Sequence, residues 1–237
     1  MPADPQPHVG FIFDLDGTLV DNMVVHREAF QRFAANHGLP TLSDTVWRQL
    51  DGKRNRDIFP ILFERDLSRD ELRHFSGEKE SLYRQLATGR LRPLAGLRRL
   101  LHRLEARDLP VAIATSAPSD NVDYTLSALA LVGRFSVVIR SDQVERGKPH
   151  PDVFLAAAAG LGVPPDRCVG FEDAPAGIDA VLAAGMTCVG LTTTMSRDNL
   201  TAHGRTPHHV VADFVEYLDG PGRWLASDRP ISAPTGG

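Results

Sequence analysis

Short apolar segments bounded by turn residues recur along the 237-residue chain. Uninterrupted apolar runs of four or five residues are typical of strands buried on both faces, as in parallel sheets. We expect strands at residues 9–13, 111–114, 137–139, 168–171, 187–191 and 209–212. Helical patterns lie between them, such as the four leucines at 97, 100, 101 and 104 and the apolar positions that follow Ser119, its expected N-cap. This alternation predicts an α/β fold with a doubly wound parallel sheet.

One segment, residues 22–92, interrupts the alternation because it contains no clear strand pattern. We expect helices at residues 24–37, near 46, at 56–63 and after 68. The run from Ser68 to Glu71 fits a capping box, which marks the start of the last of these helices.

The predicted domain organisation is therefore discontinuous. Residues 9–21 and 93–218 form the catalytic core, and residues 22–92 form an inserted helical cap. The two ends, 1–8 and 219–237, are rich in proline, glycine and polar residues, which predicts flexible termini.

Composition narrows the function classes. The formal net charge is −4 and no broad basic region is present, which argues against a nucleic-acid partner. No apolar stretch approaches the roughly 18 residues of a membrane span. Cys168 and Cys188 each lie in an apolar run, so we expect buried, reduced thiols. Together with an N-terminus unlike a signal peptide, these features predict a cytoplasmic protein, either a monomer or a homodimer.

The strongest chemical signal directly follows the first predicted strand. Asp14 and Asp16 are two positions apart, and alternate side chains of an extended backbone share a face. Gly17 then permits a sharp turn. The pattern predicts two carboxylates that converge just beyond the strand, although an acidic turn would have the same local sequence.

Polar residues also follow three other predicted strands. Thr115 and Ser116 follow one strand, Lys148 follows the next, and Glu172 and Asp173 follow a third. In open parallel sheets the ligand crevice lies at the carboxyl ends of the strands. Carboxylates there can hold Mg²⁺, a lysine and a hydroxyl can orient phosphoryl oxygens, and an aspartate can form a covalent intermediate. This set of groups favours phosphoryl transfer.

These segments give the chain its resemblance to the haloacid dehalogenase-like hydrolases, in the subgroup of β-phosphoglucomutase and the sugar-phosphate phosphatases. The four family motifs match Asp14-Leu-Asp16-Gly-Thr, Thr115, Lys148 and Glu172-Asp173, and the similarity spans about residues 9–215. The resemblance implies a doubly wound core with a helical cap inserted after the first motif.

The resemblance also implies roles for the first motif. Asp14 would be the nucleophile and a Mg²⁺ ligand. Asp16 would be the general acid and then the general base, with its backbone carbonyl on the metal. Dehalogenases of the family usually lack the second aspartate, so Asp16 argues against that activity.

The later motifs would complete the site. By resemblance, Thr115 and Lys148 hold the phosphoryl group, and Ser116 lies beside the substrate. Asp173 would bind the metal, and Glu172 would assist directly or through water.

Cap residues are expected to select the substrate. His26, Lys79 and the loop around Gly52 and Arg54 match cap positions that face the site in the family, although each could equally be an ordinary helix or loop residue. The mutase has a serine–arginine pair where this chain has Arg54-Asn55, and a lysine–asparagine pair where it has Pro118-Ser119. These departures favour hydrolysis over mutase action.

The sequence thus predicts a Mg²⁺-dependent phosphatase for a small phosphorylated metabolite such as a sugar phosphate. Three alternatives stay open. One is a phosphosugar mutase, and another is a binding protein on the same fold that has lost catalysis. The third is a pyrophosphatase, in which Asp51 would reach the metal from the cap.

Overall fold

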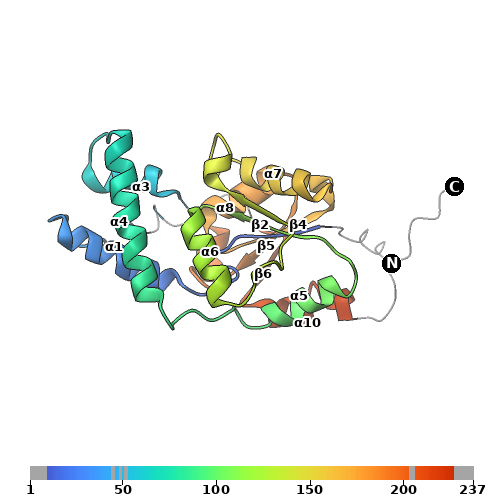
Figure 1. Ribbon diagram of the computed structural model, residues 1–237. Coiled ribbons are helices and arrows are strands. Elements are labelled where there is room, and N and C mark those ends of the chain that lie inside the picture. Colours follow the sequence, from blue (N-terminus) through green and yellow to red (C-terminus); the bar gives the residue numbers. More distant parts are fainter. Residues whose placement is uncertain (1–9, 44–45, 48–49, 51–52, 203–205, 227–237) are drawn as a thin grey trace.

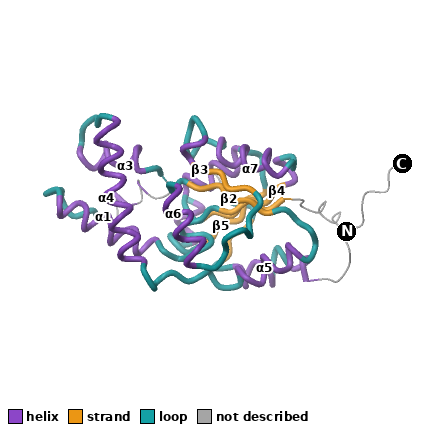
Figure 2. Tube along the Cα trace, in the orientation of Figure 1, coloured by secondary structure: helices purple, strands orange, loops and turns teal. Residues whose placement is uncertain are grey.

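The computed structural model describes residues 10–43, 46–47, 50, 53–202 and 206–226. Within these residues, six strands form one parallel sheet in the order β3-β2-β1-β4-β5-β6 (Figures 1 and 2). The strands are β1 (Gly10–Phe13), β2 (Val111–Thr115), β3 (Val137–Arg140), β4 (Cys168–Glu172), β5 (Thr187–Leu191) and β6 (His209–Val211). The order reverses between β1 and β4, the switch point at which doubly wound sheets bind ligands. The predicted fold class is confirmed.

Helices cover both faces of the sheet (Figure 1). One face packs on α5 (Leu97–Glu105), α6 (Ser119–Ala128) and α10 (Phe214–Asp219), and the other on α7 (Asp152–Leu161), α8 (Pro175–Ala183) and α9 (Arg197–Thr201). Alternate residues of β1 point to opposite faces of the sheet. Phe11 and Phe13 pack in the apolar cluster with α5, α6 and α10, and Ile12 packs in the cluster with α7, α8 and α9. The central strand is therefore buried on both faces.

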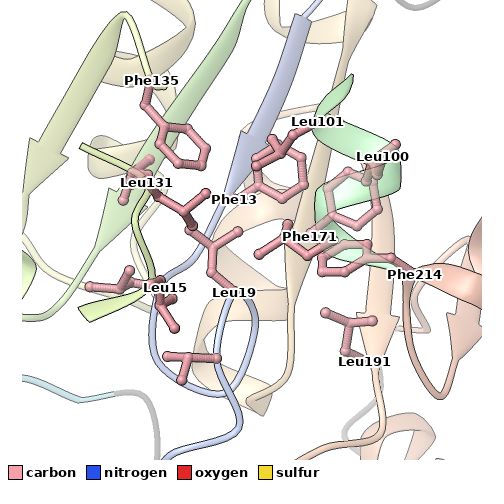
Figure 3. Packing of buried hydrophobic residues seen from close by; sticks show 14 of the residues in the cluster. Phe13, Leu15, Leu19, Leu100, Leu101, Leu131, Phe135, Phe171, Leu191 and Phe214 are labelled. Atoms are coloured by element: carbon pink, nitrogen blue, oxygen red, sulfur yellow. The ribbon is translucent and has the colours of Figure 1, made fainter. Parts of the chain in front are cut away.

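An aromatic group beneath the carboxyl ends of the strands fixes the positions of the residues that follow. The rings of Phe13 and Phe171 stack with centroids 4.7 Å apart, and Phe214 packs edge-on against both (Figure 3). Phe13 and Phe171 immediately precede Asp14 and Glu172 in the chain. Their burial therefore holds the first and last predicted motifs next to each other.

The described residues of the segment 22–92 form helices and no strands, as predicted. The segment contains α1 (Met23–Asn36), α3 (Asn55–Phe63) and α4 (Arg69–Ala87), which lie beyond one end of the sheet (Figure 1). These helices have an apolar cluster of their own around Phe33, Phe59 and Trp47. The capping box predicted at Ser68 and Glu71 is confirmed. The short helix expected near residue 46 lies partly outside the described residues.

Two sequence-based expectations are wrong. The prediction of a flexible tail is wrong for residues 220–226. Leu225 is only 1% exposed, and the centroid of the Trp224 ring lies 6.3 Å from that of the Phe11 ring. Apolar side chains in this glycine-rich stretch bury themselves against α5 and the sheet. Ser119 is the first residue of α6 and not its N-cap, which is Pro118. Residues 1–9 and 227–237, including the rest of the predicted flexible ends, lie outside the described residues.

The expectation for the two cysteines holds. Cys168 and Cys188 are free and buried in β4 and β5. No helix in the described part of the chain is long and apolar enough to cross a membrane.

Candidate active site

A cavity lies where the helical segment meets the carboxyl ends of β1, β2 and β4. From the sheet side it is lined by Asp14, Asp16, Thr115, Ser116, Glu172 and Asp173. From the helical segment it is lined by side chains that include His26, Phe30, Trp47, Lys53, Asn55, Lys79 and Glu80. Most of the predicted site residues therefore surround one space.

The backbone after β1 explains how two carboxylates reach this cavity. The Asp14 amide donates to the Phe171 carbonyl at 3.0 Å, which extends the β1–β4 ladder by one residue. Leu15 is fully buried in the core, so its neighbours Asp14 and Asp16 project to the opposite side. Gly17 has φ +81°, and a Cβ there would lie 2.0 Å from Asp173 Oδ2. Only glycine fits this turn.

Lys148 joins the first and last motifs. Its Nζ donates to Asp14 Oδ1 at 2.5 Å and to Glu172 Oε1 at 2.6 Å, and all three side chains are buried. Burial raises the pKa of Asp14 to about 8: the Lys148 charge opposes this rise and the Glu172 charge adds to it. Burial lowers the pKa of Lys148, but the two carboxylates reverse this and raise it above its usual value, so the ammonium stays charged.

Asp14, Glu172 and Asp173 form a buried acidic cluster. Each offers one oxygen, and these oxygens lie within 4.8 Å of one another. Burial, together with the charges of Glu172 and Asp14, raises the pKa of Asp173 well above its usual value. One ammonium does not balance three carboxylates. A hard divalent cation with oxygen ligands, such as Mg²⁺, fits this donor set.

Hydroxyl groups hold Asp173 in the cluster. Thr18 Oγ1 donates to its Oδ1 at 3.2 Å, and the Thr194 hydroxyl donates to its Oδ2. The Glu172 carboxylate is also fixed, because its Oε2 accepts the backbone N–H groups of residues 173 and 174. The cluster is thus preorganised, with its members held by neighbouring donors.

The Asp16 side chain takes a different direction from Asp14. Its Oδ1 accepts from Asn22 Nδ2 at 2.6 Å and lies 3.5 Å from His26 Nε2. Burial raises the pKa of Asp16, but the interaction with His26 and the hydrogen bond from Asn22 outweigh it and leave the pKa below its usual value. The Asp16 side chain is not part of the three-member acidic cluster, and the expected contact of its backbone carbonyl with a metal stays a prediction.

The predicted cap residues His26 and Lys79 meet beside Asp16. Lys79 Nζ lies 2.9 Å from His26 Nδ1, and because lysine has no acceptor it is the donor. The other ring nitrogen, Nε2, faces Asp16 Oδ1 at 3.5 Å. The Tyr83 ring stacks on His26 with centroids 3.8 Å apart. Helices α1 and α4 together orient the imidazole.

The predicted cap loop is only partly at the cavity. Arg54 is not among the described residues that line it: its Nε donates to Asp57 Oδ2 at 2.8 Å, and its side chain packs on Gly147, next to Lys148. Its neighbours Lys53 and Asn55 line the cavity instead. Gly52 and Asp51 lie outside the described residues.

Several residues at the site were missed by sequence reasoning. Asn22 holds both Asp16 and the Gly17 amide, and its Nδ2 also lies 2.6 Å from Tyr83 Oη. Glu80 was not among the predicted site residues, yet it is 5% exposed and lines the cavity. Asn121 lines it from α6 and is fully buried. No local motif marks these three residues, because tertiary contacts define their roles.

Comparison with known proteins identifies the same family as the sequence motifs. Residues 11–191 match the model of the haloacid dehalogenase-like hydrolase family. Validoxylamine A 7'-phosphate phosphatase of Streptomyces hygroscopicus subsp. limoneus is 34% identical, over 80% of this chain and 88% of that protein. Beta-phosphoglucomutase of Bacillus subtilis is 33% identical, over 76% and 81%. A hydrolase structure from Pseudomonas syringae superposes with a TM-score of 0.81 at 28% identity, covering 91% and 98%.

The chain belongs to the haloacid dehalogenase-like hydrolase family. Its relatives named as phosphatases identify the class of enzyme as phosphoric monoester hydrolase.

Proposed function

We propose that this enzyme is a Mg²⁺-dependent phosphatase that hydrolyses a small phosphorylated metabolite, with sugar phosphates as the substrate class. The observation that carries the proposal is the position of Asp14, held by Lys148 within a cluster of carboxylates at the end of β1. Support also comes from relatives such as the phosphorylated carbohydrates phosphatase of Thermotoga maritima, 33% identical over 74% of this chain.

The proposed reaction has two displacements at phosphorus. In the first, an Asp14 oxygen forms a bond to phosphorus while the bond to the substrate oxygen breaks, and Asp16 gives its proton to the departing alkoxide. In the second, water attacks the aspartyl-phosphate, Asp16 takes a proton from that water, and the acyl-phosphate bond breaks to free Asp14 and inorganic phosphate. Covalent catalysis of this kind replaces one difficult step with two easier ones.

Asp14, Glu172 and Asp173 would hold the Mg²⁺ ion, which supplies positive charge against the phosphoryl oxygens. Lys148 adds a second fixed cation beside Asp14, and Thr115 and Ser116 line the cavity as hydroxyl donors for the phosphoryl group. Asp16 is ionised in the free protein because its pKa is lowered. An incoming phosphate dianion opposes that shift, so Asp16 can take up the proton it donates.

The organisation proposed for the chain follows from this chemistry. Residues 9–21 and 93–218 supply the phosphoryl-transfer groups, and residues 22–92 act as the cap that covers them. The free buried cysteines favour a reducing compartment, so we place the enzyme in the cytoplasm.

Mutase action is the second candidate, and its support is the resemblance to beta-phosphoglucomutase. A mutase must hold a sugar hydroxyl in line and exclude water. At the cavity wall, Ala117 and Pro118 occupy positions next to the phosphoryl-binding hydroxyls, and neither side chain can hydrogen-bond a sugar. This observation favours water as the second nucleophile.

One assay separates the candidates. The enzyme is incubated with Mg²⁺ and β-glucose 1-phosphate, with and without a glucose bisphosphate, while free phosphate and glucose 6-phosphate are both followed. A parallel panel of sugar and polyol phosphates is screened for phosphate release. The proposal expects phosphate release without the bisphosphate. Faster accumulation of glucose 6-phosphate would establish the mutase, and no turnover of any substrate would indicate a binding protein.

A further inference from the structure

A second polar group lies in the cavity, separate from the phosphoryl-transfer residues. Glu80 on α4 accepts from Asn55 Nδ2 at 2.6 Å on Oε1 and from Asn121 Nδ2 at 2.6 Å on Oε2. Lys79 Nζ also donates to Oε1, at 2.9 Å. The two amides come from α3 and from α6, so the carboxylate connects three helices. Glu80, Asn55 and Asn121 are called the cap triad below.

The phosphatase chemistry does not use this group. A carboxylate that is 5% exposed is costly to bury, and three donors arranged around it indicate that its charge is retained. Burial raises the pKa of Glu80, but Lys79, His26 and the hydrogen bonds outweigh this and lower it below its usual value. Glu80 is thus an ionised acceptor at neutral pH.

The triad has hydrogen-bonding capacity to spare. A carboxylate offers about four acceptor positions, and three are occupied: two on Oε1 and one on Oε2. The Asn121 amide has two N–H groups; one donates to Glu80, while its Oδ1 accepts from Arg84. All three side chains line the cavity, as do the apolar groups of Phe30 and Trp47. Hydroxyl groups on a carbon chain match this combination of acceptors, donors and apolar surface.

The charge at this end of the cavity works against a second anion. Two cations contact the triad, and both already have partners there: Lys79 donates to Glu80 and to His26 Nδ1, and Arg84 donates to Asn121 Oδ1. A phosphate or carboxylate placed against the triad would face the Glu80 charge in a buried setting, where like charges repel strongly. Lys53 and Arg27 also line the cavity, so an anionic tail directed to either of these cations is the competing arrangement.

We propose that Glu80, held by Asn55 and Asn121, determines substrate specificity by accepting a hydroxyl of the non-phosphorylated end. The enzyme then selects sugar or polyol phosphates with a neutral, hydroxylated tail and rejects those with a second anionic group. This inference rests on the proposed phosphatase activity and assigns the part of the site that distinguishes one substrate from another.

The test compares two linear hexose derivatives, sorbitol 6-phosphate and 6-phosphogluconate, which differ at the far end as a hydroxymethyl group and a carboxylate. We expect the wild-type enzyme to favour sorbitol 6-phosphate in kcat/KM. The Glu80→Gln variant keeps the shape but removes the charge, and it should reduce that preference roughly 10-fold or more. The matched control is Glu78→Gln, which changes a carboxylate on the same helix that pairs with His37 outside the cavity and should leave the preference unchanged.

A second variant covers the case in which Glu80→Gln fails to fold. Glu80→Asp keeps the charge but is one methylene shorter, so it should raise KM for sorbitol 6-phosphate about 10-fold while discrimination against 6-phosphogluconate persists. The inference is overturned if the wild type prefers 6-phosphogluconate, if Glu80→Gln leaves the preference unchanged, or if Glu80→Asp leaves KM unchanged. Phosphate release from p-nitrophenyl phosphate is measured in parallel. Its absence in the wild type would instead refute the phosphatase proposal.

Discussion

The ammonium of Lys148 lies 2.5 Å from Oδ1 of Asp14, and these two residues are 134 positions apart in the chain. The contact brings the loop after β3 to the end of β1 and leaves one cation facing three clustered carboxylates. One cation is too few to keep three buried carboxylates ionised, and this shortage of positive charge is the physical basis of the first prediction.

Mg²⁺ should stabilise the folded enzyme. At a concentration 100-fold above its dissociation constant, a ligand specific to the native state adds about 2.7 kcal/mol to the free energy of unfolding, which corresponds to about 5–10 °C in Tm. Thermal unfolding followed with Mg²⁺ and with a chelator measures this shift. The Asp173→Asn variant should lose most of it, because one ligand of the cluster is neutralised. Equal melting temperatures in both conditions would refute the proposed metal site.

Gly177 should be intolerant of any side chain. A Cβ there would lie 1.7 Å from Glu172 Oε1, and the Glu172 carboxylate is fixed by Lys148 and two backbone amides. Gly177→Ala should therefore displace Glu172, lower kcat/KM by roughly 10-fold or more and destabilise the fold by about 1–3 kcal/mol.

Gly77 provides the matched control. It is exposed within α4, and a Cβ there meets nothing within 4 Å. Gly77→Ala should keep full activity and raise the free energy of unfolding by about 0.5–1 kcal/mol, because alanine favours the helix. Steady-state kinetics and denaturant unfolding of the two variants provide the comparison. Equal behaviour of both variants would contradict the role given to the contact between Gly177 and Glu172.

Asn22 should set the pH profile through Asp16. The Asn22 amide donates to the Asp16 carboxylate at 2.6 Å and helps to lower its pKa. Removing this donor disfavours the charged form, so Asn22→Ala should raise the pKa of Asp16. Because the first step needs the protonated acid, kcat/KM falls as pH rises through that pKa. In Asn22→Ala, the descending limb of the pH profile of kcat/KM should therefore move to higher pH.

The pH dependence of kcat/KM for sorbitol 6-phosphate, whose leaving group is an alkoxide that needs the proton, tests this shift. Asn36→Ala, at the far end of the same helix, is the control and should reproduce the wild-type profile. If the descending limb of the Asn22→Ala profile stays in place or moves to lower pH, Asn22 does not lower the pKa of Asp16.

Much of the fold could be predicted from the sequence because local patterns determine it. The strands around Phe13 and Phe171 are continuous apolar runs, and their motifs place Asp14, Glu172 and Asp173 at strand ends. The capping box of Ser68 and Glu71 could also be predicted, because its two partners are three residues apart in the sequence.

The remaining features depend on contacts between distant segments. Glu80 looks like a surface charge in sequence, and only the approach of α3 and α6 shows it to be buried. Arg54 was expected to face the substrate; in the structure its Nε donates to Asp57 and its side chain packs on Gly147, contacts that no local pattern indicates. The buried Leu225 was missed because one apolar residue in a glycine-rich stretch has no periodicity.

The central claim is that Asp14 is the nucleophile, and phosphate release by Asp14→Asn tests it most directly. The substitution keeps the size of the side chain and removes the attacking carboxylate, and Asp21→Asn, an exposed aspartate in the same loop, is the control. Both variants are assayed with saturating Mg²⁺ on p-nitrophenyl phosphate, after their melting temperatures confirm folding. The account predicts a loss of roughly 10³-fold or more for Asp14→Asn and wild-type activity for Asp21→Asn. Activity of folded Asp14→Asn within about 10-fold of the wild type would contradict it.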